Sequence, residues 1–159
     1  MGDIVTASGT RYFIGPAGTA AQFDTLAEFE AVSVWTEIGL VENGGEYGDE
    51  ASAVTGAALG DGRIRKAKGA RDAGTLALVC FHDPLDAGQA ALAAAEQTND
   101  NYVFKVVLPD GPVGYSDTIE YFRGLVMSRR KQVNTNDNII RLMVNIGINS
   151  EIFSDPAST

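Results

Sequence analysis

Alternation of hydrophobic and polar residues marks most of the regular structure in this chain. Residues 101–108 (NYVFKVVL) put every second side chain on one apolar face, formed by Tyr102, Phe104, Val106 and Leu108. Comparable alternation, or short runs rich in β-branched and aromatic residues, predicts further strands at 9–15, 31–47 (one strand, or a pair broken near Asn43), 75–81, 117–133 and 138–148. The pattern therefore predicts a mainly β protein.

Two long predicted strands form a hairpin. Residues 117–133 lead into a turn at 134–137 and return as 138–148, with Gly124 as a bend or bulge in the first strand. Both strands are long, because strands usually contain about 5–6 residues. A hairpin of this size has edges that must be paired, covered or protected by charge.

A single helix is expected. Asp83 is a good N-cap and Pro84 fits the first helical position, so the helix is predicted at 84–97 (PLDAGQAALAAAEQ). Its apolar face is modest, which is typical of a helix that lies against one side of a sheet.

One internal segment has no hydrophobic period. Residues 48–69 are mainly Gly, Ala, Ser and charged residues, and they predict a loop of a length that is usually functional or disordered. The termini, 1–8 and 149–159, are predicted to be flexible or exchanged arms. The whole chain, 1–159, is expected to form a single domain, since 159 residues with 45% hydrophobic content can bury a core.

Acidic and basic residues occur in separate blocks. The net charge is −9, and the segment from Asp24 to Glu50 carries eight acidic residues and no basic one. The segment 63–71 instead carries five basic residues: Arg63, Arg65, Lys66, Lys68 and Arg71. The acidic excess argues against tight binding of nucleic acid. Separate blocks favour contact between complementary surfaces, although a solvated loop would carry the same residues.

Membrane and disulfide chemistry are not expected. The longest apolar runs are far shorter than the ~20 residues that cross a membrane. Cys80 is a lone cysteine on an apolar strand, which predicts a buried, inert thiol and is compatible with a reducing cytosol.

Candidate catalytic or metal-binding residues are few. His82 is the one histidine and is expected to help cap the helix, and the pair Asp49–Glu50 is expected to be solvated. The stretch GDGRIR at 60–65 lacks the third glycine of a dinucleotide fingerprint and the Lys-Ser/Thr ending of a phosphate-binding loop. We expect neither an enzyme, nor a bound metal, nor a cofactor.

Three motifs follow one another along the chain: KGARDAGTL before the strand at 75–81, DAGQAAL at the start of the helix, and FRGLVMS in the long strand. In this order and spacing they resemble the major tail tube protein of long-tailed, non-contractile bacteriophages, the lambda-like tail tube family. The resemblance covers roughly residues 9–153.

The resemblance implies a β-sandwich or split barrel with one flanking α-helix, assembled as hexameric rings. Long β-hairpins from the copies would form a shared inner barrel, and the rings would stack into a hollow tail tube of the virion. Double-stranded DNA would pass through the lumen during ejection without tight binding. A tape-measure protein and a tail terminator would be further partners, and the chain would be made in the cytoplasm of the host bacterium.

The resemblance also implies that residues 48–69 form an inter-ring stacking loop. Its contact residues would be Asp49, Glu50, Arg63, Arg65, Lys66, Lys68 and Arg71. Three further acidic residues, Glu37, Glu42 and Glu46, are candidates for the acidic surface that receives this loop, or for the wall of the lumen. The sequence leaves both roles open. An acidic wall would leave DNA hydrated and mobile, because each basic contact to phosphate adds affinity.

Alternatives remain at this point. A secretion-system tube protein, or another tail ring protein such as a terminator, would share the assembly features. A monomeric β-barrel that binds a small ligand is less consistent with the long hairpin, because such a barrel closes on itself.

Overall fold

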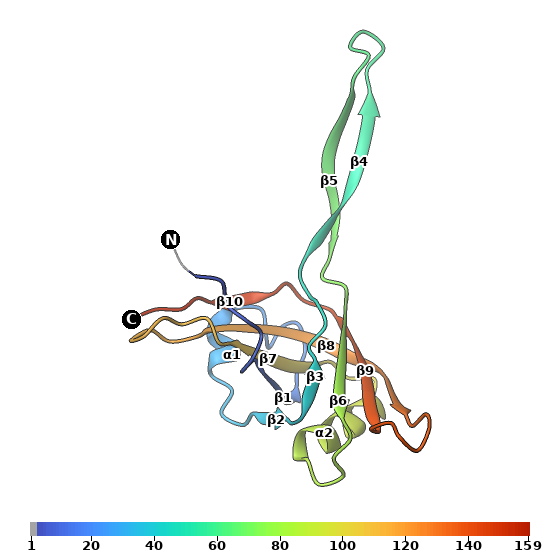
Figure 1. Ribbon diagram of the computed structural model, residues 1–159. Coiled ribbons are helices and arrows are strands. Elements are labelled where there is room, and N and C mark those ends of the chain that lie inside the picture. The colour runs from blue at the N-terminus through green and yellow to red at the C-terminus, as the bar shows by residue number, and fades with distance from the viewer. Residues whose placement is uncertain (1–2) are drawn as a thin grey trace.

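The computed structural model describes residues 3–159 and contains ten strands and two helices in that range. Figure 1 shows a body from which one long hairpin projects. The strands are β1 (Arg11–Ala17), β2 (Thr36–Ile38), β3 (Val41–Asn43), β4 (Glu50–Ala57), β5 (Ile64–Asp72), β6 (Thr75–Phe81), β7 (Tyr102–Leu108), β8 (Thr118–Gln132), β9 (Arg141–Ile148) and β10 (Phe153–Asp155). The helices are α1 (Leu26–Glu30) and α2 (Ala87–Glu96).

The body is built on one antiparallel sheet of eight strands. Seven strands follow the order β2-β1-β7-β8-β9-β6-β3, and β10 pairs with the first part of β8. The two outer strands of this order, β2 and β3, are consecutive in the chain and are separated only by Gly39 and Leu40, where Leu40 has a φ of 55°. The sheet therefore curls until its ends meet at one bend, which gives the split barrel expected for the chain.

The core lies inside this curled sheet. Every second residue of the central strands points inward, as the alternation of the sequence predicts, and the inward residues include Phe104, Phe122, Leu78 and Leu142. Helix α2 packs against β8 and β2 and adds Leu92 to this core. Because these side chains fill the interior, the barrel is a packed core.

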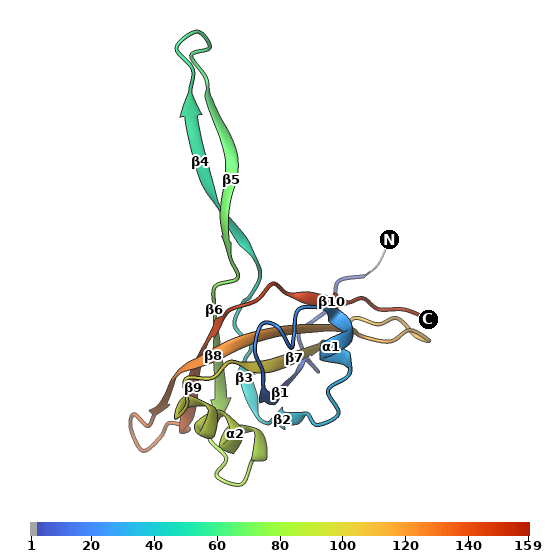
Figure 2. The ribbon, with the colours of Figure 1, turned by 180° about the vertical axis from the view of Figure 1, so that it is seen from behind.

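A second cluster covers the outer face of β7 and β8. Phe29 of α1 is fully buried there, 5.7 Å from the ring of Tyr121 and 5.1 Å from the ring of Phe153. Figure 2 shows α1 and β10 beside one another on this side of the sheet. The prediction of a single helix was therefore wrong, because the five-residue α1 is too short to produce a period in the sequence.

Several predicted boundaries need correction. Helix α2 begins at Ala87 with Asp86 as its N-cap, one turn later than predicted, so Asp83 and Pro84 lie in the preceding turn. The first strand continues through Gly15 and Pro16 to Ala17. The C-terminal arm is not wholly free, because residues 153–155 pair with β8. Within the described residues, no helix is long and apolar enough to span a membrane.

Candidate assembly arm

The segment predicted to be a loop at 48–69 is a β-hairpin instead. Strands β4 and β5 pair in register from Glu50–Asp72 to Ala57–Ile64, with a bulge between Ala51 and Ala53. We call residues 50–72 the arm. These strands could not be predicted from hydrophobic alternation, because both faces of the arm are exposed and neither strand needs an apolar face. Figure 1 shows the arm extending well beyond the sheet.

The arm has no core of its own. Almost all of its residues are exposed, including the apolar side chains of Val54 at 56%, Ile64 at 65% and Leu59 at the tip. An isolated two-stranded hairpin is marginally stable in water. This arrangement is typical of an element that packs against a partner surface.

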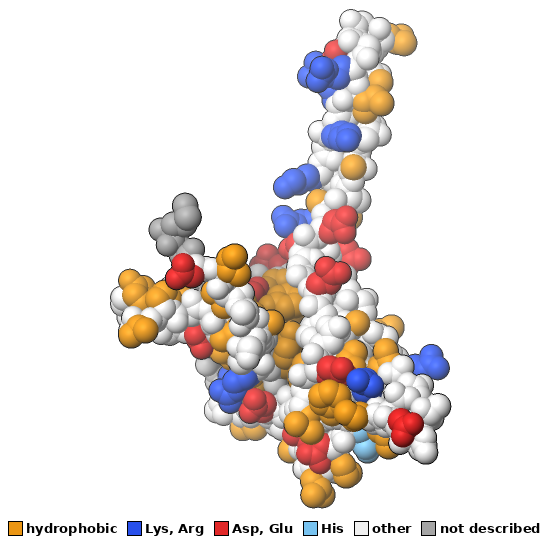
Figure 3. Space-filling view, viewed as in Figure 1, with side chains coloured by type: hydrophobic (Ala, Val, Ile, Leu, Met, Phe, Trp, Pro, Cys, Tyr) orange, Lys and Arg blue, Asp and Glu red, His pale blue; other side chains and the backbone are white. Residues whose placement is uncertain are grey.

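The basic block of the sequence is carried by the arm. Figure 3 shows Lys and Arg side chains spaced along its length. Lys66 lies opposite Thr55 and Lys68 opposite Ala53, on one face, while Arg65 lies opposite Gly56 on the other. Arg65 also pairs with Asp61 in the turn, at 2.7 Å from Nε to Oδ2. Arg63 lies just before β5, so the tip and middle of the arm are basic on both faces.

Acidic residues gather where the arm leaves the body, as Figure 3 shows. Asp49, Glu50 and Asp72 lie at this base, and Glu50 and Asp72 face each other across the two strands. Arg71 is paired there with Asp49, with 3.4 Å between Nη2 and Oδ2. Of the predicted contact residues, the structure thus brings Asp49, Glu50 and Arg71 together at the base.

The base of the arm is held firmly by the body. The Tyr12 hydroxyl donates to the carbonyl of Gly44 at 3.0 Å, and the Tyr47 hydroxyl donates to Glu120 at 3.1 Å. The Tyr47 ring also packs 6.0 Å from that of Phe122 in the core. Burial, with help from Glu120, raises the pKa of Tyr47. On the other strand, the Gly74 carbonyl accepts from Ile148 N–H at 3.1 Å. Sequence reasoning missed these residues, since they lie far apart in the chain.

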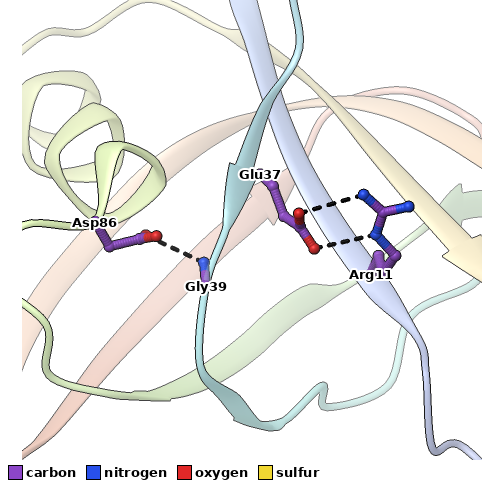
Figure 4. A network of polar contacts seen from close by, with 4 residues as sticks. All are labelled: Arg11, Glu37, Gly39 and Asp86. Atoms are coloured by element: carbon purple, nitrogen blue, oxygen red, sulfur yellow. Dashed lines mark hydrogen bonds and ion pairs between the residues drawn. The ribbon is translucent and has the colours of Figure 1, made fainter.

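The three further acidic candidates lie on the body. Glu37 on β2 forms a bidentate pair with Arg11 on β1, at 3.1 and 3.3 Å, as Figure 4 shows. Glu42 on β3 is paired with Arg141 on β9, at 3.1 Å from Nη2 to Oε1, and this hydrogen bonding lowers the pKa of Glu42. Glu46 is exposed near the base of the arm and has no ion pair within residues 3–159. Two of the three candidates therefore already have partners inside the chain.

The motif DAGQ serves to attach α2. Asp86 accepts from the backbone N–H of Gln89 at 2.9 Å and from that of Gly39 at 3.1 Å. The amide of Gln89, a buried side chain, donates to the carbonyls of Phe81 and Gly39. These bonds tie the helix to the bend between β2 and β3.

The remaining chemistry-bearing residues do not form a site. His82 follows β6, and its backbone N–H donates to the carbonyl of Ile140 at 3.0 Å. Cys80 is fully buried, and burial raises the pKa of its thiol to about 11, so it stays protonated. Over residues 3–159, no group of three or more His, Cys, Asp or Glu side chains could hold a metal ion.

Known proteins share this architecture. The SPP1 tail tube superposes with a TM-score of 0.71 at 12% identity, over 96% of this chain and 80% of that one. A component of the anti-feeding prophage baseplate superposes with a TM-score of 0.69 at 7% identity, over 98% of both chains. At these identities the likeness concerns the fold. No curated protein sequence matches the chain significantly.

Family membership comes from the sequence model of the phage tail tube proteins, which matches residues 6–153. That range contains the arm, both helices and every strand of the body except the last two residues of β10. The chain therefore belongs to the phage tail tube protein family, and it is a structural component of the phage tail in the virion rather than an enzyme.

Proposed function

We propose that copies of this chain form hexameric rings that stack head to tail into a hollow tube, and that the arm links each ring to the next. The observation that carries the proposal is the arm itself, a hairpin of 23 residues (50–72) with a firm base and both faces exposed. Such a ribbon needs a partner surface to become rigid. A contact between unlike surfaces of identical copies produces filaments instead of closed dimers.

In this proposal, electrostatic attraction between the arm and the adjacent ring drives the docking. Arg63, Arg65, Lys66 and Lys68 dock on acidic surface of the adjacent ring, while the exposed Val54 and Ile64 add apolar area. Complementary charge fixes orientation and suppresses wrong partners. Tube formation should then weaken with added salt, because exposed charges are screened over about 10 Å at 0.1 M.

Not all acidic candidates are equally available to receive the arm. Glu37 and Glu42 are engaged by Arg11 and Arg141, whereas Glu46 and Glu50 have no ion pair within residues 3–159. We assign Glu46 and Glu50 to the docking surface. Glu37 and Glu42 are assigned to bracing of the sheet through Arg11 and Arg141, with the wall of the lumen as the alternative role.

The remaining partners follow from the same proposal. Long hairpins such as β8–β9 from the six copies form a shared inner barrel, and double-stranded DNA passes through it without tight binding. The chain's net charge of −9 supports weak contact with DNA, since few basic residues are free to neutralise phosphate. A tape-measure protein and a tail terminator complete the set of partners in the tail.

The test replaces Arg63, Arg65, Lys66 and Lys68 together with Ala. We expect the variant to stay folded in circular dichroism, because the arm lies outside the core, and to fail to form tubes in negative-stain electron microscopy. The matched control is Arg63→Lys with Arg65→Lys, which keeps the charge and should still assemble. Normal tubes with unchanged salt sensitivity in the fourfold variant would refute the electrostatic dock.

A further inference from the structure

Arg123, in the motif FRGLVMS, is a buried cation that has no counter-ion among residues 3–159. Its side chain is only 8% exposed, on the outer face of β8 opposite Val103. Among the described residues, the guanidinium makes one hydrogen bond, from Nη2 to the carbonyl of Asn149 at 3.2 Å, and its buried Nε has no partner. Within residues 3–159, no carboxylate lies within ion-pairing distance of it.

Arg123 is one of the residues that line a surface groove. One wall is the segment after β1, with Thr19 and Gln22, and the other is the segment between α2 and β7, with Asn99, Asp100 and Asn101. The two walls are joined by a bond from the Gly18 N–H to the Asn101 carbonyl at 2.9 Å. The groove is therefore a polar recess that reaches a buried positive charge.

We propose that this groove is a contact between copies, in which a carboxylate side chain of a neighbouring copy enters and pairs with Arg123. A guanidinium offers five N–H donors in a planar fork that matches a carboxylate. Burying a charge without a counter-charge is costly, and a carboxylate from outside removes that cost. The inference rests on the proposed assembly of the chain with itself.

The occupant is a second copy for reasons of charge. The chain has 21 acidic and 12 basic residues, so every copy presents carboxylates in excess. Phosphate groups of DNA are a weaker fit, because Arg123 is the single basic residue among residues 3–159 that lines the groove. Binding to a phosphate backbone depends on several basic contacts.

The first test measures the concentration at which tubes form. Arg123→Gln should raise it roughly tenfold to a hundredfold, the loss expected for a charge-assisted bond. Lys105→Gln removes an equal charge from the neighbouring strand β7, outside the groove, and should shift it far less. Melting of the dilute monomer shows whether each variant is folded. If Arg123→Gln does not fold, the proposal is tested instead by cross-linking of the charge-retaining variant Arg123→Lys, as described next.

The second test identifies the partner group. Tubes of Arg123→Lys are assembled from equal amounts of ¹⁴N- and ¹⁵N-labelled chains and treated with a carbodiimide, which joins an amine to a carboxylate in contact with it. We expect cross-linked peptides of mixed isotope that contain position 123. Two outcomes would overturn the inference. One is that position 123 is cross-linked only to Asp100 of the same chain. The other is that position 123 forms no cross-link although the native lysines do.

The two proposals fail in different ways. If the unmodified protein forms no tubes, the proposed function fails. If it forms tubes and Arg123→Gln forms them at the same concentration, the groove is not a contact between copies. A change in DNA binding by Arg123→Gln with normal assembly would assign the groove to phosphate instead and overturn the inference.

Discussion

The carboxylate of Asp86 accepts a hydrogen bond from the backbone N–H of Gly39 at 3.1 Å, as Figure 4 shows, while the same oxygen caps helix α2. Gly39 lies in the bend between β2 and β3, where the two ends of the curled sheet meet. One side chain thus starts the helix and fixes the closure of the sheet. Residues 44–49 connect β3 to the arm, so this contact also holds the strand that precedes the arm at its start.

Loss of the Asp86 carboxylate should destabilise the whole body. Asp86→Ala removes an N-cap, which costs about 0.5–2 kcal/mol, and leaves the Gly39 N–H without a partner, which costs about 1–3 kcal/mol more if the group stays buried. Asp86→Asn keeps an accepting oxygen and should lose less. Urea denaturation of the three proteins measures the difference, and equal unfolding free energies would contradict this role.

Close approach of α2 to β2 makes Gly88 difficult to replace. A Cβ at this position would lie 2.1 Å from the backbone oxygen of Glu37, so the helix or the strand must shift. We expect Gly88→Ala to lower the unfolding free energy by about 1–3 kcal/mol, the usual cost of overpacking. Gly56→Ala is the control, because a Cβ on the arm meets open space. Unfolding curves in which both variants match the parent would show that α2 is not held closely.

Tyr47 should make stability depend on alkaline pH. Its folded-state pKa is raised, so the neutral phenol is favoured in the folded protein, and the stability it contributes is fully present below the unfolded pKa of about 10. That contribution is lost as the pH rises above this value. Tyr47→Phe keeps the ring but cannot ionise, so its unfolding free energy should fall less between pH 9 and 11. Parallel profiles for both proteins would argue against this pKa shift.

Removing the arm should leave the body folded. The arm contributes no side chain to either core cluster, so replacement of residues 51–71 by a short Gly-containing turn should change the unfolding free energy by less than about 1 kcal/mol, or about 2–4 °C in Tm. Calorimetry measures the change. A much larger loss would mean that the arm stabilises its own subunit, which would weaken its assignment as a link between rings.

The sequence predicted best the parts of the fold that pack in the chain's own core. Residues 75–81 form β6 with the predicted bounds, and β7, β8 and β9 differ by one to three residues at their ends, because their inward side chains must alternate. The start of α2 was predicted too early, since both Asp83 and Asp86 can cap a helix and the structure uses Asp86, which accepts from the backbone N–H groups of Gln89 and Gly39.

The arm and the groove could be identified only from the structure. Strands β4 and β5 pair without burying either face, so nothing local distinguishes them from a loop. Three of the acidic candidates, Glu37, Glu42 and Asp49, turned out to face basic partners distant in the chain. Arg123 lies in a recognised motif, but its burial and its free Nε depend on the two segments that surround it.

Negative-stain electron microscopy of the concentrated protein, beside the variant with four basic arm residues replaced by Ala, tests the central claim most directly. The proposal predicts six-fold rings and hollow tubes for the parent, and no tubes for the arm variant although its monomer remains folded. Monodisperse small particles for the parent at every concentration, or equally long tubes for both proteins, would contradict it.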